Sequence, residues 1–167
     1  KPEISLESRM ELLDLRLKEV EDALEEGDQS VKLDPVTHQP IVRLTHEFLK
    51  RHLKSNPDAY VETEAFNREL KLNSIGFKRI ENLRGFINLK FLRLDRNEII
   101  RITGLDTMKQ LVSLNLSVNL IRRIENLDGL PELASLNLSE NLIEKIEGLE
   151  MNTKLEHLDL SMNQIGK

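Results

Sequence analysis

Residues that could carry chemistry are few in this chain, and their spacing does not match a known kind of site. The four histidines are His38, His46, His52 and His157, and the chain contains no cysteine. Thiolate metal sites, disulfides and cysteine nucleophiles are therefore excluded. No pair of histidines has the HExxH spacing of a zinc site, and we interpret His46 with Glu47 as solvated surface rather than as metal ligands.

Motifs for phosphate binding and for nucleophilic catalysis are also missing from the sequence. The chain contains no GxxxxGKS or GxxxxGKT loop, no GxGxxG loop and no GxSxG elbow. The tripeptides that begin at Asn115 and Asn137 match the glycosylation acceptor pattern, but both belong to a repeat and we expect them to be unmodified. The sequence therefore predicts a protein that is not an enzyme, with no catalytic residue, no metal and no cofactor.

The composition indicates one globular domain with an acidic appendage. The chain has 167 residues, of which 39% are hydrophobic and 4% aromatic, so the core must be aliphatic. Residues 1–66 carry 9 Lys/Arg and 15 Asp/Glu, a net −6, and residues 67–167 carry 15 and 14, a net +1. Neither half is strongly basic, which argues against direct binding of nucleic acid. Without a long apolar run or a signal peptide, and without cysteine, we expect a cytoplasmic chain that does not enter a membrane.

A repeat of 22 residues fills the range 67–167. Its pattern is LxxLxLxxNxIxxIxxL, and the four asparagines at its centre are Asn97, Asn119, Asn141 and Asn163. Full copies begin at Leu89, Leu111 and Leu133, and a partial copy begins at Leu155. An imperfect copy precedes them and has Ile75 in place of the asparagine. We therefore expect about four and a half repeats, of which the first acts as a cap.

The spacing within each copy predicts an α/β leucine-rich-repeat solenoid. Leu92 and Leu94 are two residues apart, so both point to one face of a short strand. Parallel strands then stack on the concave face, while loops or short 3₁₀ or helical turns return the chain over the convex face. One repeat cannot bury its own apolar face, so neighbouring repeats must share a core. Each asparagine is expected to satisfy backbone groups where the chain leaves its strand.

The first 66 residues are predicted to form a helical arm, a linker and a cap. Residues 1–27 read as an acidic amphipathic helix whose heptad seam is Leu6, Met10, Leu13, Leu17, Val20 and Leu24. This helix would either dock on its own domain or form a coiled coil with a partner or a second copy. Residues 28–41, with Pro35 and Pro40, read as a linker. Residues 42–66 read as a capping helix, over about 42–54, followed by a loop that covers the open end of the solenoid.

Two surfaces are candidate sites for a protein partner. The first is the concave face with an apolar edge, where Leu120 and Leu142 would either be exposed or tuck into the turn. It comprises Phe91, Arg93, Asp95, Ser113, Asn115, Val118, Ser135, Asn137, His157, Asp159 and Met162. The second is a basic ridge, which would bind an acidic segment or pair with a parallel row of glutamates. It comprises Lys78, Arg79, Arg101, Arg122, Arg123 and Lys145.

The repeat endings NLIRRIENL and NLIEKIEGL resemble the 22-residue class of leucine-rich repeats. That class includes the nuclear regulatory subunit of protein phosphatase-1, the U2 small nuclear ribonucleoprotein A′ protein and the outer-arm dynein light chain 1. LTHEFLKRHL at 44–53 and ELKLNSIGFKRIENL at 69–83 are similar to the corresponding segments of the dynein axonemal assembly factor 1 family. This resemblance implies a cytoplasmic adaptor of cilia or flagella that supports assembly or docking of axonemal dynein. The alternatives are a subunit that docks the phosphatase-1 catalytic domain and a splicing-type ribonucleoprotein adaptor, either of them nuclear.

Overall fold

The computed structural model describes residues 31–33, 40–57 and 59–166. The chain divides into two compact units, residues 1–42 and 43–167, and each is described by itself. The acidic heptad helix expected over residues 1–27 lies outside the described residues. Among the described residues, no helix has the length and apolar character needed to span a bilayer.

The first unit contains two short strands where the sequence predicted a linker. Strand β1, Val31–Leu33, pairs antiparallel with β2, Pro40–Val42, and Leu33 lies opposite Pro40. The linker prediction over 28–41 was therefore wrong for these two segments. That prediction rested on Pro35 and Pro40, but proline is tolerated as the first residue of a strand, as Pro40 is in β2, and does not by itself indicate a linker.

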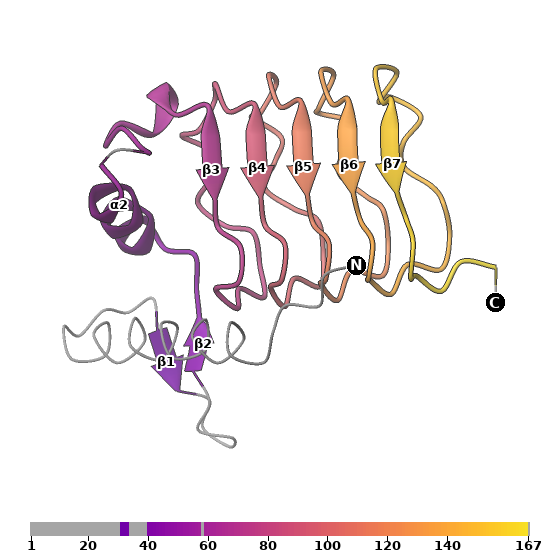
Figure 1. Ribbon diagram of the computed structural model, residues 1–167, viewed down its shortest axis with the longest axis horizontal. Coiled ribbons are helices and arrows are strands. Elements are labelled where there is room, and N and C mark those ends of the chain that lie inside the picture. The colour runs from indigo at the N-terminus through magenta and orange to yellow at the C-terminus, as the bar shows by residue number, and fades with distance from the viewer. Residues whose placement is uncertain (1–30, 34–39, 58, 167) are drawn as a thin grey trace. The chain divides into compact units, whose positions relative to one another are not determined.

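The second unit is built on a five-stranded parallel sheet in the order β3-β4-β5-β6-β7. The strands are β3 Glu69–Lys71, β4 Phe91–Arg93, β5 Ser113–Asn115, β6 Ser135–Asn137 and β7 His157–Asp159. The five strands lie side by side in this order (Figure 1). Each residue pairs with the residue at the same place in the next repeat, as Leu92 does with Leu114. This register confirms the predicted leucine-rich-repeat solenoid.

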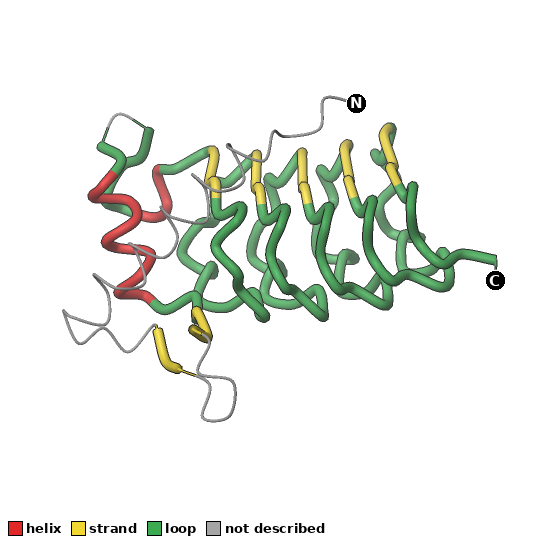
Figure 2. The backbone as a smooth tube through the Cα atoms, turned by 60° about the horizontal axis from the view of Figure 1, so that its bottom comes forward, coloured by secondary structure: helices red, strands yellow, loops and turns green. Residues whose placement is uncertain are grey.

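Two rows of leucine form the core under the strands. The central leucine of strands β3 to β6 is buried, while the residues on either side of it are more exposed. A second row follows directly after the strands, and its members Leu72, Leu94, Leu116 and Leu138 are fully buried. Turns and loops return the chain on the side opposite the strands (Figure 2). In the last turn Leu158 is 40% exposed, against 1% for Leu136 one repeat earlier, because no described strand follows β7.

Helix α2, His46–Ser55, lies beside the first repeat at the β3 end of the sheet (Figure 1). It begins at His46 rather than near residue 42 because Thr45 is its N-cap and accepts a hydrogen bond from the Phe48 N–H at 3.1 Å. Leu49 and Leu53 are buried, and the Phe48 ring meets the Phe77 ring edge to face at 5.3 Å. The short 3₁₀ helix η1, Glu64–Phe66, precedes β3. The helix thus covers core side chains of the first repeat.

Candidate functional site

The repeated asparagines form a ladder that joins each repeat to the one before it. Asn119 accepts a hydrogen bond from the Ile99 N–H at 3.0 Å and donates to the carbonyls of Leu94 and Leu116, both at 3.0 Å. Asn97, Asn141 and Asn163 make equivalent bonds with the preceding repeat. Except for the half-buried Asn163, these side chains are buried, so the ladder is structural and is not a surface for a partner.

The direction of these bonds explains why Ile75 can replace the asparagine in the first repeat. Asn97 accepts from the N–H groups of Ile75, Gly76 and Phe77, at 3.1, 2.7 and 3.2 Å. Each ladder residue therefore serves the backbone of the preceding repeat. An asparagine at position 75 would reach back towards helix α2, where there is no equivalent turn to satisfy. Ile75 is thus compatible with the capping role expected of this repeat.

The exposed face of the sheet, which we call the strand face, gathers the side chains that flank the central leucines. Residues at the first strand position are Glu69, Phe91, Ser113, Ser135 and His157, and those at the third are Lys71, Arg93, Asn115, Asn137 and Asp159. Neighbouring strands lie about 4.8 Å apart, so these residues form two rows across the sheet. All of the strand residues predicted for the concave face are brought together here.

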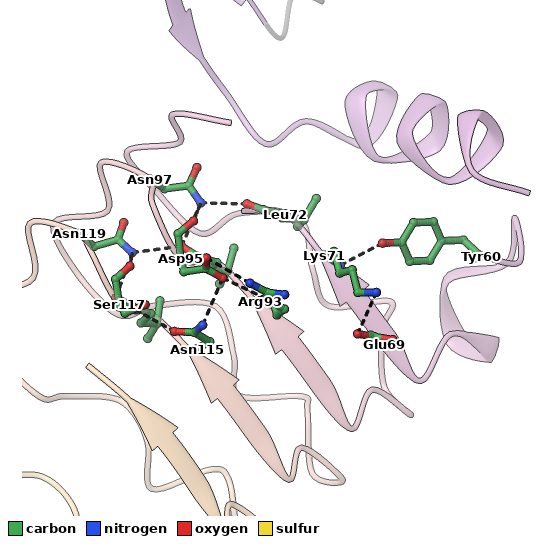
Figure 3. A network of polar contacts seen from close by, with 12 residues as sticks. Tyr60, Glu69, Lys71, Leu72, Arg93, Asp95, Asn97, Asn115, Ser117 and Asn119 are labelled. Carbon is green, nitrogen blue, oxygen red and sulfur yellow. Dashed lines mark hydrogen bonds and ion pairs between the residues drawn. The ribbon is translucent and has the colours of Figure 1, made fainter. Parts of the chain in front are cut away.

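Asp95 does not belong to the accessible surface, and its prediction as a partner-binding residue was wrong. Its side chain is only 7% exposed, because the strand ends at Arg93 and the carboxylate lies against polar neighbours (Figure 3). It accepts hydrogen bonds from Nε and Nη2 of Arg93, at 3.2 and 3.4 Å, and from Nδ2 of Asn115 at 3.2 Å. The buried carboxylate thereby holds the Arg93 side chain, which stays 47% exposed, in one position.

The aromatic and charged end of the strand face lies over β3 and β4. Phe91 is 47% exposed and shares this face with Arg93. On β3, the Lys71 ammonium pairs with Glu69 at 3.4 Å, and the Lys71 N–H donates to the Tyr60 hydroxyl at 3.1 Å (Figure 3). An exposed aromatic ring beside a fixed guanidinium is an arrangement that interfaces favour.

The centre of the strand face is polar and carries small side chains. Oδ1 of Asn115 accepts from the Ser117 N–H at 3.0 Å, and Oδ1 of Asn137 accepts from the N–H and the hydroxyl of Ser139 at 2.9 and 2.8 Å. These bonds fix the side chains against the turn. No described residue accepts a hydrogen bond from Nδ2 of Asn137, so this amide can donate to a carbonyl of a bound chain.

The apolar edge predicted from the sequence is exposed in part. Val118, Leu120 and Met162 are 37%, 44% and 67% exposed, and Leu142 is half-buried. Leu120 therefore does not tuck into its turn, whereas Leu142 does so in part. Val118 and Met162 have positive φ angles of 56° and 57° and lie in the turns that follow their strands.

The basic ridge is largely occupied by ion pairs. Nε and Nη2 of Arg101 donate to Glu125 at 2.8 and 3.0 Å, and Arg123 Nε donates to Glu147 at 3.0 Å. Hydrogen bonding from Arg101 is the main cause that lowers the pKa of Glu125. The shortest recorded ion pairs of Lys78 and Arg79, with Glu98 and Glu81, are longer, at 3.8 and 3.6 Å. No described acidic residue pairs with Arg122 or Lys145, and binding of an acidic segment by the ridge stays a prediction.

His52 lies in the cap and has a structural environment that sequence reasoning missed. Its ring stacks on Phe48 at 5.9 Å and lies 5.4 Å from the Tyr60 ring. Its buried Nε2 has no hydrogen-bond partner among the described residues. Burial lowers the pKa of His52, and the backbone of Lys71 opposes this shift. Within the described ranges, no group of three acidic or histidine side chains could hold a metal ion.

Comparison with known proteins agrees with this geometry. The family model described as Leucine Rich repeats (2 copies) matches residues 109–151 and 131–167. Internalin C2 of Listeria monocytogenes is a similar solved structure, with 30% identity over 60% of this chain and a TM-score of 0.57. The SNF/U2A′ complex of Drosophila melanogaster contains a chain with 30% identity over 58% of this chain and a TM-score of 0.53.

The match covers only part of each of these two proteins. The chain spans 45% of the internalin C2 chain and 59% of the matched chain in the SNF/U2A′ complex. A search of curated proteins finds no match. Residues 109–167 carry leucine-rich repeats, and the five stacked strands form a leucine-rich-repeat solenoid.

Proposed function

We propose that the chain is a non-enzymatic scaffold that binds a partner protein on its strand face. The observation that carries this proposal is the pair formed by Phe91 and Arg93, both half-exposed on β4, with Arg93 held by the buried Asp95. Aromatic and arginine side chains contribute most of the energy in many interfaces. A guanidinium that is already fixed loses less conformational entropy when it binds.

The small side chains at the centre of the strand face support binding of an extended polypeptide. Ser113 and Ser135 are neighbours on adjacent strands and leave space above the sheet for a second backbone. Asn137 offers an amide donor to a carbonyl of such a chain. Phe91 would act as the apolar anchor beside these small polar side chains. Interfaces commonly have an apolar core of this kind with a polar rim around it.

For the identity of the partner, the proposal is a ciliary or flagellar one. The resemblance of the IGFKRIENL segment, and of the helix before it, to the dynein axonemal assembly factor 1 family supports an adaptor in the assembly or docking of axonemal dynein. The structure has this segment as the first repeat and its preceding cap, helix α2. The proposed location is accordingly the cytoplasm and the axoneme.

A second candidate is a splicing-type adaptor in the nucleus. It is favoured by the 30% identity to a chain of the SNF/U2A′ complex, a complex of two proteins. In this case the partner would again be a protein, since the net charge of residues 67–167 is close to zero and gives little attraction to nucleic acid. Docking of a phosphatase-1 catalytic domain is the remaining alternative and is tested by the same experiment.

The test is affinity capture with the tagged chain from ciliated-cell extract and from nuclear extract, followed by quantitative mass spectrometry. We expect axonemal dynein subunits or their assembly factors to be recovered, and to be lost with the double variant Phe91→Ala/Arg93→Ala. The control is Asp128→Asn, an exposed residue in a return segment of the solenoid. Recovery of only phosphatase or spliceosomal proteins would contradict the ciliary proposal, and recovery that survives the double variant would contradict the strand face as the binding surface.

A further inference from the structure

Part of the apolar edge of the strand face lies in the turns that follow strands β5 and β6. We call it the aliphatic patch and define it as Val118, Leu120 and Leu142. Backbone hydrogen bonds of 2.9 Å place these residues in adjacent turns: Val118 N–H donates to the Ser139 carbonyl, Leu120 N–H to that of Ile99, and Leu142 N–H to that of Ile121. These backbone bonds fix the backbone of the patch before a partner binds, which lowers the entropic cost of binding.

Val118 has a backbone conformation that its side chain disfavours. Its φ is +56°, in the left-handed region, where a β-branched side chain crowds the backbone. The equivalent residues of the other repeats, Ser74, Arg96, Glu140 and Met162, share this backbone but are not β-branched. Val118 is 37% exposed, so burial in the core does not offset the strain. The positive φ belongs to the turn that follows each strand, so the strain at Val118 comes from its β-branched side chain and not from an unusual backbone.

The charges beside the patch differ between its two ends. Glu140 and Glu144 precede and follow Leu142, both are exposed, and neither forms an ion pair with a described residue. On the other side, Arg122 follows Leu120 in the preceding repeat. Lys145, which follows Glu144 and is also exposed, offsets one of these two charges, so the Leu142 end of the patch keeps one net negative charge. A partner that covers the aliphatic side chains would place its own residues next to these two carboxylates, where basic side chains are favoured.

We propose that the aliphatic patch docks a partner segment that carries aliphatic side chains followed by lysine or arginine. The aliphatic side chains would cover Val118, Leu120 and Leu142, and the basic residues would face Glu140 and Glu144. This proposal rests on the scaffold function, because it assumes a protein partner. It uses residues other than Phe91 and Arg93, so the two surfaces can be tested apart.

The test uses methyl NMR spectra of the whole chain with two synthetic peptides as probes. Both have leucines along one helical face; one carries lysines at its other positions and the other carries glutamates. We expect the lysine peptide to shift the methyl signals of Val118, Leu120 and Leu142, and the glutamate peptide to bind roughly fivefold more weakly, as two exposed ion pairs imply. Equal binding of the two peptides, or shifts elsewhere on the chain, would overturn the proposal.

Two variants make the test specific. The double variant Glu140→Lys/Glu144→Lys should reverse the preference between the peptides, and an unchanged preference would refute the assigned role of the carboxylates. Val118→Asn should weaken lysine-peptide binding while raising the melting temperature, because asparagine tolerates the left-handed backbone. A lower melting temperature would refute the strain argument. Absence of peptide binding, with partner capture through Phe91 and Arg93 retained, would overturn this inference alone.

Discussion

Replacing Asn119 by alanine tests the bonds that join the repeats. The change leaves the buried Ile99 N–H without its acceptor, the Asn119 side-chain oxygen at 3.0 Å. It also removes one donor each from the carbonyls of Leu94 and Leu116, but these keep the amides of Asn97 and Asn141 at 2.9 and 3.0 Å. An unsatisfied buried N–H costs about 2 kcal/mol and the two weakened carbonyls about 0.5 kcal/mol each. Asn119→Ala should therefore lower the free energy of unfolding by about 3 kcal/mol.

The assay is urea unfolding followed by circular dichroism, with Asn163→Ala as the matched control. Asn163 makes the same bonds, to the Ile143 N–H and the carbonyls of Leu138 and Leu160, but it is only half-buried. Water can replace its bonds in part, so the cost should be about 1 kcal/mol. A loss below about 0.5 kcal/mol for Asn119→Ala, or equal losses for the two variants, would show that burial of the ladder bonds does not stabilise the solenoid as expected.

Four further predictions follow from the same geometry. Leu116→Ala should destabilise the fold by about 2–5 kcal/mol in urea unfolding, because Leu116 is fully buried. Val118→Asn should raise the free energy of unfolding by about 1 kcal/mol in the same assay. Burial lowers the pKa of His52 in the folded chain below its ordinary 6.5, so the unfolded chain binds the proton more readily. The free energy of unfolding should therefore be highest above pH 6.5 and should fall as the pH drops below 6.5. Urea unfolding at several pH values should show a smaller fall for His52→Gln. Because Ser113 and Ser135 are register partners, Ser113→Cys/Ser135→Cys should form a disulfide on mild oxidation, and a change in mobility on non-reducing gels that dithiothreitol reverses would report it.

The repeat could be predicted from the sequence because strand pairing follows directly from its spacing. Leu92 and Leu94 define one buried face, and the fixed interval brings Leu114 and Leu116 beside them in the next strand. The asparagine positions indicated the ladder for a similar reason, since a polar side chain at each bend must satisfy buried backbone groups. Local spacing and shared burial were sufficient for these features.

The burial of Asp95 could not be predicted from that spacing. Alternation along an ideal strand would place Asp95 on the exposed face with Arg93, but the strand ends at Arg93. The carboxylate is then buried by contacts with Arg93 and with Asn115 from the next repeat. One of these contacts depends on how a neighbouring repeat packs, which the pattern of a single repeat does not specify.

The sequence offered a parallel row of glutamates as partners of the basic ridge, but it did not specify which repeat supplies each glutamate. The alignment of repeats stacks Arg101 beside Arg123, which suggests a continuous basic row. In the structure Arg101 reaches across to Glu125 and Arg123 reaches to Glu147, each in the following repeat. Side-chain length and rotamer decide this offset, so the ridge is less basic than its sequence indicates.

Photo-crosslinking tests most directly whether the strand face holds the partner. A photoreactive p-benzoylphenylalanine replaces Phe91, which is half-exposed on β4, and in a matched protein it replaces Asp128 in a return segment. After irradiation in ciliated-cell extract, we expect a covalent adduct from the Phe91 position and none from the Asp128 position. Adducts of equal yield from both positions, or from Asp128 alone, would contradict the account.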